Sequence, residues 1–217
     1  MSNHWACWVS AAAGPSKSPQ MGDEDIILTR NLKSHTGSKE LHMCPARKQV
    51  EHGTGPVASR PAIQDYGVPK SKAGLLSWED IDKRLTDSRY YWICTVDTKG
   101  QPHTTPVDGL WLDETLYFGG SPSTRRNRNL VNNSKVSVHL ESGSDVVILH
   151  GEAGEQPPLD RALAARLAEL HGIKYGYGFK AENFVSGGPG LYIFRPRVAF
   201  AWSQFPKDAT RWDFPER

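Results

Sequence analysis

The stretch YFGGSPSTRRNRNLVNNSKVSVHL, residues 117–140, decides the fold predicted for this chain. It begins with the alternating pattern of a strand and then breaks at residues 119–122, Gly-Gly-Ser-Pro, which favour a turn. Ser123 or Thr124 comes next, with a hydroxyl that can cap the free N–H groups of a helix start. Two asparagines end this short helix, and residues 136–140 alternate again as a strand. The stretch therefore predicts a strand, a tight turn, a short helix and a second strand in succession.

Three arginines, Arg125, Arg126 and Arg128, lie in the first turns of the predicted helix. The start of a helix carries partial positive charge and free N–H groups, which favour an anion. Arginine adds planar, paired donors that match the oxygens of a phosphate. The stretch therefore predicts an anchor for a phosphate group. The residues alone leave a second interpretation open, in which the three arginines are a solvated helix face.

Composition limits the classes of protein that need to be considered. The 217 residues leave room for one domain with a real core, with or without an unstructured extension. The 26 Lys and Arg residues barely exceed the 24 Asp and Glu residues, so the net charge of +2 argues against a nucleic-acid or membrane-binding polycation. The three cysteines have no paired spacing, which indicates a reducing compartment. Without an apolar run that could cross a bilayer, or a convincing export signal, we expect a cytoplasmic protein.

The first part of the chain, residues 1–72, lacks apolar periodicity and is rich in Gly, Pro, Ser, Lys and His. We expect it to be mostly disordered. It holds His35, His42, Cys44 and His52, which are residue types that bind zinc. Their spacing fits no paired-ligand pattern, so no metal site is predicted.

Residues 73–217 are predicted to form the folded domain, with mainly β structure. The expected strands cover residues 90–96, 103–107, 110–112, 115–119, 136–140, 145–154 and 191–203, the last kinked at Pro196. Gly109 is expected to interrupt the chain between the second and third of these strands. Pro106 is expected to make its own strand an edge or a bulge.

Besides the helix of the opening stretch, two helices are expected. One starts at the capping box Ser77-Trp78-Glu79-Asp80, and the other covers residues 159–171 and is stopped by Gly172. Residues 174–190 contain five glycines and are expected to form a mobile loop. The aromatic residues of the C-terminal tail indicate that the tail is not a solvated end.

Many short strands, close turns and few helices favour a small β-barrel with helices at its ends. Such a barrel fills its interior with its own side chains. A large ligand must then bind outside the barrel or between two copies, which favours a dimer.

With these elements in place, the chain resembles the pyridoxamine 5′-phosphate oxidase-like family of flavin-binding split β-barrels, over roughly residues 75–214. The resemblance rests on four pieces: YWICTVDTKGQPHTTPVDGLWLDETLYFGG (91–120), STRRNRNLVNNSKVSVHLESG (123–143), VVILHGEA (146–153) and AWSQFPKDATRW (201–212). It implies a homodimer with an FMN, or the related deazaflavin coenzyme F-420, in each of two sites at the subunit interface.

The resemblance also implies which residues bind the cofactor. In the family a Ser-Arg-Lys triplet holds the cofactor phosphate, and Thr124, Arg125 and Arg126 occupy the matching positions. The strand that lines the flavin ring corresponds to His103, Thr104, Thr105, Pro106 and Val107. A C-terminal Trp and Arg that reach the flavin from the partner subunit in the oxidase correspond to Trp202 and Arg211.

The function implied is that of an FMN-dependent oxidoreductase that transfers a hydride to or from a small molecule. The ring carries the redox chemistry in such a protein, which fits the lack of a nucleophile–base pattern in the sequence. No individual catalytic residue is predicted. Two alternatives stay open: a reductase of the same fold that uses coenzyme F-420, and a non-catalytic module that binds a flavin or haem.

Overall fold

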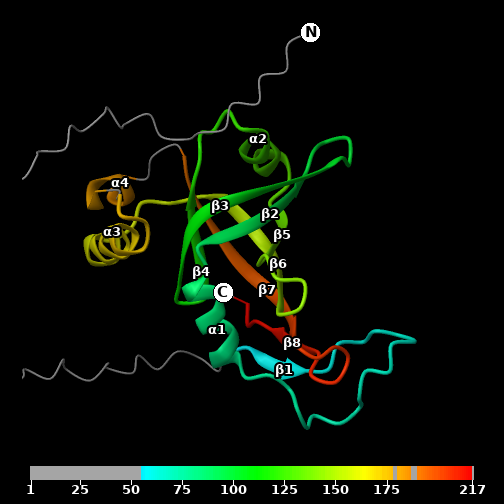
Figure 1. Ribbon diagram of the computed structural model, residues 1–217. Helices are drawn as coiled ribbons and strands as arrows, with labels where there is room; N and C mark the ends of the chain where they lie inside the picture. Colours follow the sequence, from blue (N-terminus) through cyan, green and yellow to red (C-terminus); the bar gives the residue numbers. More distant parts are fainter. Residues whose placement is uncertain (1–54, 178–179, 187–189, 217) are drawn as a thin grey trace, which may run out of the picture. The chain divides into compact units, whose positions relative to one another are not determined.

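The computed structural model of the protein describes residues 55–177, 180–186 and 190–216 (Figure 1). Its strands are β1 (Val57–Ser59), β2 (Tyr90–Val96), β3 (Pro102–Leu112), β4 (Thr115–Gly119), β5 (Lys135–His139), β6 (Val146–Glu155), β7 (Leu191–Trp202) and β8 (Thr210–Asp213). Its helices are α1 (Trp78–Asp87), α2 (Arg125–Asn132), α3 (Arg161–Tyr175) and α4 (Ala181–Val185).

Six of the strands close into a barrel. Within the described residues the strands form one antiparallel sheet in the order β1-β8-β7-β4-β3-β2-β5-β6, and β6 also pairs with β7. Because β6 also pairs with β7, the series of six strands that runs from β7 to β6 closes on itself. The prediction of a mainly β protein with a small barrel and flanking helices is confirmed.

The long strand β3 passes from one partner to another along its length. Its first part pairs with β2 as far as Asp108, and its second part pairs with β4 from Gly109 onward. The predicted interruption at Gly109 is therefore wrong, because the strand continues through the glycine. A Cβ atom there would lie 2.8 Å from Leu116 Cδ1, so close packing requires the glycine. Pro106 lies in the part that pairs only with β2, as the prediction of an edge position requires.

The barrel interior is filled by apolar side chains from alternate positions of its strands, as strand periodicity dictates. The largest fully buried ones include Tyr91, Ile93, Leu116, Val138, Leu149 and Phe194. Helix α1 adds Ile81 and Leu85 to this core. At the other end of the barrel, α2 adds Leu130 (Figure 1).

A second, smaller core lies between β3–β4 and the pair α3–α4. Helix α3 continues past Gly172 to Tyr175, so the predicted stop is wrong. The hydroxyl of Tyr175 accepts the N–H of Gly109 at 2.8 Å and donates to the carbonyl of Arg89 at 2.7 Å, which holds the last turn against the barrel. The helix ends instead at Gly176, whose φ of 75° suits a glycine cap.

The expected mobile loop, residues 174–190, contains the helix α4. Its Phe184 is 3% exposed and packs in the second core. This tertiary contact explains a helix that a glycine-rich sequence does not suggest. Residues 178–179 and 187–189 of the segment lie outside the described residues.

Order begins earlier than the predicted boundary at residue 72. Strand β1 pairs with β8, and the guanidinium of Arg60 donates to the carbonyls of Lys207 and Ala209 at 2.9 and 3.0 Å. These partners are far away in the sequence, so local composition could not reveal them. The rest of the predicted extension, residues 1–54, lies outside the described residues. The aromatic C-terminal tail packs as expected, with Trp212 only 1% exposed.

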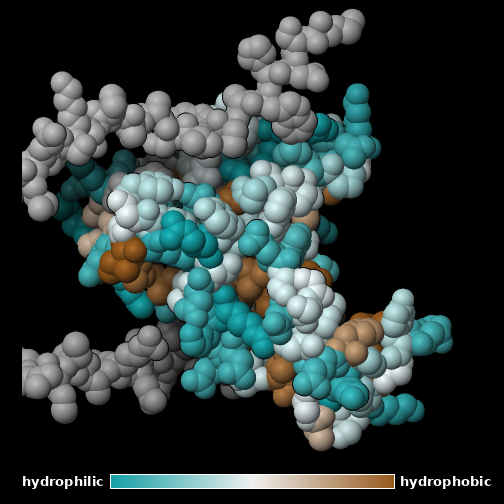
Figure 2. All heavy atoms as spheres, viewed as in Figure 1, coloured by the Kyte–Doolittle hydropathy of each residue, from teal (hydrophilic) through white to brown (hydrophobic). Residues whose placement is uncertain are grey.

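The side of the molecule seen in Figure 2 is mostly hydrophilic, with hydrophobic side chains in small separate patches. One patch lies at α3, the helix on which Ile173 is 75% exposed. None of the helices formed by the described residues is long and apolar enough to cross a membrane.

Candidate functional site

The turn between β4 and α2, together with the first turn of the helix, is called here the α2 tip (residues 119–128). Thr124 is the helix cap, and its hydroxyl accepts the N–H of Asn127 at 3.4 Å. The amide of Asn127 donates to the carbonyls of Gly120 and Ser121 at 3.1 and 2.8 Å, which fixes the turn. The N–H groups of the first helical residues have no acceptor inside the helix. Because the N–H of Asn127 already donates to Thr124, the N–H groups of Arg125 and Arg126 are the ones available to an anion.

Arg125 is one of the two exposed arginines of the α2 tip, the other being Arg128. Its guanidinium lies 3.0 Å from a carboxylate oxygen of Asp97 in the β2–β3 turn. The other carboxylate oxygen of Asp97 accepts the N–H groups of Lys99 and Gln101, each at 2.9 Å. These backbone hydrogen bonds, more than Arg125, lower the pKa of Asp97, so it remains a carboxylate at neutral pH.

Arg126 points away from its neighbour and into the protein. It is 6% exposed, and it donates to the carbonyl of Gly119 and to the side chain of Asn127, both at 3.1 Å. Its guanidinium carbon lies 5.6 Å from the centre of the Phe118 ring. A Cβ atom at Gly120 would lie 2.2 Å from this guanidinium, so the buried arginine requires that glycine. The two predicted anchor arginines thus differ in direction and in exposure.

The predicted ring-binding strand brings one more residue to the α2 tip. His103 is half-buried, and its pKa is lowered by burial and by the nearby charges of Arg125 and Arg126. The cause shows that the two guanidiniums create a positive potential at the histidine. Such a potential attracts an anion.

The other predicted residues of β3 are divided between two faces. Thr105 and Val107 lie on the face of His103, with Val107 6% exposed in the barrel core. Thr104 and Pro106 are exposed on the opposite face, beside Cys94 and Trp92 of β2. Because neighbouring strand residues alternate, one flat ring cannot contact all five predicted side chains from one side.

Trp202 and Arg211 lie far from the α2 tip of the same chain. Trp202 ends β7 and packs against Phe205, with ring centres 5.4 Å apart. Arg211 lies in β8, pairs with Asp213 and covers the ring of Phe200 at 5.5 Å. Figure 1 shows β8 and α2 at opposite ends of the barrel. A single chain does not bring the two predicted C-terminal residues to the anchor.

The outside of the barrel carries a set of half-buried apolar side chains that we call the outer face. They project from β2, β6 and β7 and comprise Trp92, Cys94, Val146, Ile148, Phe200 and Trp202. Two histidines belong to the same face: His139 stacks on Trp92 at 6.2 Å, and His150 lies 5.6 Å from Phe200. Aromatic and aliphatic groups left partly exposed on a sheet indicate a surface that another molecule covers.

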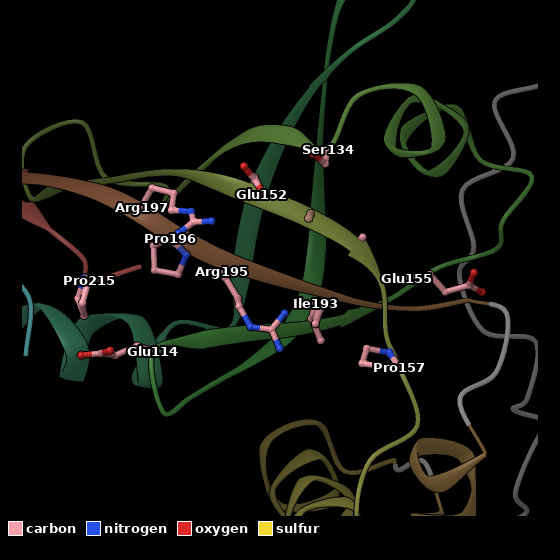
Figure 3. Close-up of a pocket in the computed structure, with 12 residues that line it drawn as sticks. Glu114, Ser134, Glu152, Glu155, Pro157, Ile193, Arg195, Pro196, Arg197 and Pro215 are labelled. Atoms are coloured by element: carbon pink, nitrogen blue, oxygen red, sulfur yellow. The ribbon is translucent and has the colours of Figure 1, made fainter. Parts of the chain in front are cut away.

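A hollow that the sequence did not reveal lies elsewhere on the barrel, over β6 and β7 (Figure 3). This β6–β7 groove has a volume of about 530 Å³ and is lined by Glu114, Ser134, Glu152, Ala153, Gly154, Glu155, Pro157, Ile193, Arg195, Pro196, Arg197 and Pro215. None of the residues predicted to bind the cofactor lines it. The Arg-Pro-Arg run at 195–197 is visible in the sequence, but the carboxylates that face it depend on the strand register.

Metal-binding side chains do not gather in the described part of the chain: no group of three or more His, Cys, Asp or Glu residues there could hold an ion. The functional candidates are therefore the α2 tip, the outer face and the groove.

Comparison with known families identifies the chain. The model of the family described as Pyridoxamine 5′-phosphate oxidase matches residues 77–195, which is more than half of the 217 residues. This chain belongs to the pyridoxamine 5′-phosphate oxidase-like family. The family match includes β3 and the α2 tip, but it ends before Trp202 and Arg211. The predicted resemblance to this family is confirmed.

Solved structures with similar folds come from several bacteria. An FAD-binding protein from Mesorhizobium loti is 21% identical, with a TM-score of 0.43, and the similarity covers 63% of this chain and 95% of that protein. A heme binding protein from Mycobacterium smegmatis is 19% identical, with a TM-score of 0.45 and coverage of 59% and 55%. HupZ from Group A Streptococcus is 17% identical, with a TM-score of 0.44 and coverage of 65% and 100%. Similarity this weak supports no choice of ligand. No curated protein matches the chain significantly.

Proposed function

We propose that this protein is a flavin-dependent oxidoreductase that binds FMN through its phosphate at the α2 tip. Membership of the family supports the class of protein. The observation that carries the site is the exposed guanidinium of Arg125 at a helix start capped by Thr124, with the buried guanidinium of Arg126 behind it. Burial, and then the charges of these two arginines, lower the pKa of His103, which fits a positive potential there. A phosphate dianion is the part of FMN that such a potential attracts.

The three residues of the proposed anchor have different roles. Arg125 is exposed, and its guanidinium can donate to a phosphate either after it separates from Asp97 or while it still pairs with it. Thr124 offers its hydroxyl and lies next to the free N–H groups of the helix. Arg126 is buried and already donates to Gly119 and Asn127, so it supports the turn and adds positive charge from behind. Direct phosphate contact therefore falls mainly on Arg125 and the backbone.

The flavin ring is proposed to lie on the barrel exterior, against the exposed residues Thr104 and Pro106 and next to Trp92. The half-buried outer face supports a homodimer, because a second copy would cover its aromatic side chains. Trp202 and Arg211 are at the opposite end of the barrel from α2, so they can contribute to the site only from a partner subunit. The proposed homodimer therefore completes the site as well as covering the face.

The bound flavin would supply the hydride chemistry, and the chain's own residues would bind it, orient it and exclude water. His103 lies close enough to the proposed phosphate site for the charges of Arg125 and Arg126 to contribute to its lowered pKa. Its lowered pKa keeps it neutral at pH 7, so it can act there as a hydrogen-bond partner without adding charge.

A comparison of FMN with riboflavin tests the anchor, because riboflavin has the same ring and lacks the phosphate. Arg125→Ala is expected to weaken FMN binding by about 1.5 to 3 kcal/mol, the range for a hydrogen bond to a charged group. Riboflavin binding should change little. The matched control is Arg161→Ala, because Arg161 is also an exposed first residue of a helix with an oxygen cap, Asp160. Flavin fluorescence titrations give all the affinities.

Equal losses for FMN and riboflavin in Arg125→Ala would contradict the phosphate anchor. A strictly monomeric protein in sedimentation experiments, with and without FMN, would contradict the interface site.

Oxidation of a reductant by the loaded protein distinguishes an oxidoreductase from a flavin or haem carrier. The mass of the molecule released on denaturation distinguishes FMN from coenzyme F-420.

A further inference from the structure

The β6–β7 groove is separate from the proposed flavin site and is shaped by an irregularity in the sheet. His150 pairs with Val198, but the next residue of β6, Gly151, pairs with Pro196. Arg197 is therefore an extra residue on β7, and it forms a β-bulge. A Cβ atom at Gly151 would lie 2.1 Å from the carbonyl of Arg195, so the bulge requires this glycine. Arg195 and Arg197 occupy alternate positions of β7, so both are exposed while Pro196 between them is buried.

The groove combines an apolar lining with charged side chains of both signs. Ala153 and Ile193 are 3% and 6% exposed and belong to its lining, together with the prolines at 157, 196 and 215. Figure 3 shows Arg195, Arg197, Glu152 and Glu114 around the same hollow. A concave site with an apolar lining and a few polar groups is typical of small-molecule binding, and about 530 Å³ is within the usual range of volumes.

Four charged side chains of the groove, those of Arg195, Arg197, Glu152 and Glu155, form no ion pair with any described residue. Glu152 lies directly opposite Arg195 in the β6–β7 register, a position where opposite charges normally pair. Within the described residues, however, neither Arg195 nor Arg197 forms an ion pair or a side-chain hydrogen bond. Glu152 and Glu155 likewise make no ion pair with a described residue. The groove thus offers free donors and free acceptors at the same time.

Glu114 reaches the groove from an unusual backbone conformation. It and Asp113 form the two-residue β3–β4 turn with φ of 56° and 49°. Glycine or asparagine normally fills such positions, because a left-handed backbone strains other residues. The turn thus holds a carboxylate at the edge of the groove where a glycine would be easier to accommodate.

We propose that the β6–β7 groove binds a small zwitterion with an apolar body, which is the chemistry of a free aromatic or large aliphatic amino acid. The two guanidiniums hold its carboxylate, Glu152 opposite Arg195 holds its ammonium group, and Ile193 and the prolines contact its apolar part. A simple dianion fits less well, because three carboxylates and two guanidiniums give the lining a net negative charge.

Three matched probes test this proposal with the full chain. L-Phenylalanine carries both charges, 3-phenylpropionate lacks the ammonium group, and 2-phenylethylamine lacks the carboxylate. Isothermal titration is expected to show saturable binding of L-phenylalanine and at least about tenfold weaker binding of each analogue, since one charge-assisted contact is worth about 1.4 kcal/mol or more.

The variants separate the two ends of the ligand. The double variant Arg195→Gln/Arg197→Gln should weaken the binding of L-phenylalanine at least about tenfold and leave the binding of 2-phenylethylamine unchanged. Glu152→Gln should also weaken the binding of L-phenylalanine, but it should leave the binding of 3-phenylpropionate unchanged. Arg161→Gln, on the surface of α3, is the control. FMN affinity should be equal in all of them, so this test stands whether or not the flavin proposal holds.

Three results would overturn the zwitterion site. One is no saturable binding of L-phenylalanine up to about 10 mM, a concentration that detects even weak sites. Another is unchanged affinity in the double arginine variant when its thermal unfolding matches that of the parent. The third is equal binding of 3-phenylpropionate and L-phenylalanine, which would make the groove a plain anion site.

Discussion

Arginines come in pairs at two places in this protein: Arg125 and Arg126 at the α2 tip, and Arg195 and Arg197 in the β6–β7 groove. At the tip one guanidinium pairs with Asp97 and the other is buried against Gly119 and Asn127. In the groove neither guanidinium has such a partner among the described residues, and both face a hollow of about 530 Å³. The tip has the motif of an anion site, whereas the groove has the free donors and the concave surface.

This difference shows what adjacent arginines in a sequence do and do not establish. On a helix, residues i and i+1 project about 100° apart, so Arg125 and Arg126 cannot face one ligand equally. On a strand, residues i and i+2 share a face, so both groove arginines are exposed on the same side of β7. Spacing therefore has to be interpreted together with the element that carries it.

The largest expected effect tests the claim that Arg126 is a structural residue. Arg126→Ala leaves the carbonyl of Gly119 without its donor and removes the contact with Phe118. We expect the free energy of unfolding to fall by about 3 kcal/mol, the sum of charged hydrogen bonds and a cation–π contact. Urea denaturation measures it.

Arg197→Ala is the matched control from the groove and should change the free energy of unfolding by less than about 0.5 kcal/mol, as an unpaired surface residue does. If Arg126→Ala were as stable as this control, the assignment of Arg126 to the support of the turn would be wrong.

The second expected effect concerns Asp97, whose carboxylate pairs with Arg125 and would compete with a bound anion for its guanidinium. Asp97→Asn keeps an oxygen for the N–H groups of Lys99 and Gln101 but removes the charge that pairs with Arg125. FMN should then bind about five- to tenfold more tightly at low salt, because Arg125 is released and a like charge is removed from the phosphate. Fluorescence titration at low and high salt measures the gain, which salt should reduce.

Asp87→Asn is the control, since Asp87 forms an exposed pair with Lys83 on α1, at the other end of the barrel. Weaker FMN binding in Asp97→Asn would mean that Asp97 orients Arg125 and does not compete for it.

The fold could be predicted from the sequence wherever local chemistry decides it. The cap at Thr124, the cap at Ser77 and the strand Tyr90–Val96 all appear as expected. The predictions are wrong where distant contacts outweigh local propensity. Helix α3 continues through Gly172 because Tyr175 holds its last turn to the barrel, and β1 forms because it pairs with β8. The residues next to a given position in the sequence do not indicate which distant residues contact it in the fold.

The candidate site was predictable to the same extent. The motif placed Thr124 and Arg125 at an exposed helix start, which is a local property. The burial of Arg126 depends on the path of the chain at Gly120, and the groove depends on a register between β6 and β7 that spans about 40 residues of sequence. Neither could be obtained without the three-dimensional arrangement.

The third expected effect concerns the backbone at the edge of the groove. Glu114→Gly places the residue that a left-handed turn prefers at a φ of 56°. We expect the free energy of unfolding to rise by about 1 kcal/mol, since the strain at this position is removed. Urea denaturation of Lys99→Gly, an exposed turn residue without a positive φ, serves as the comparison. A destabilised Glu114→Gly would mean that contacts of the Glu114 side chain outweigh the strain and would remove the argument from backbone conformation.

The smallest expected effect tests the positive potential that distinguishes the α2 tip. In the folded protein the pKa of His103 lies below its usual value of 6.5, because of burial and the charges of Arg125 and Arg126. Below pH 6.5 the unfolded chain therefore binds a proton that the folded chain does not, so the free energy of unfolding falls as the pH falls through this region. Urea midpoints measured at pH 7.5 and 5.5 should decrease more in the parent protein than in His103→Gln. Bound FMN should reduce the difference, since its phosphate offsets the two guanidiniums and lets His103 accept a proton. If the parent and His103→Gln lost stability equally, with or without FMN, the potential at the tip would be too weak to hold a phosphate.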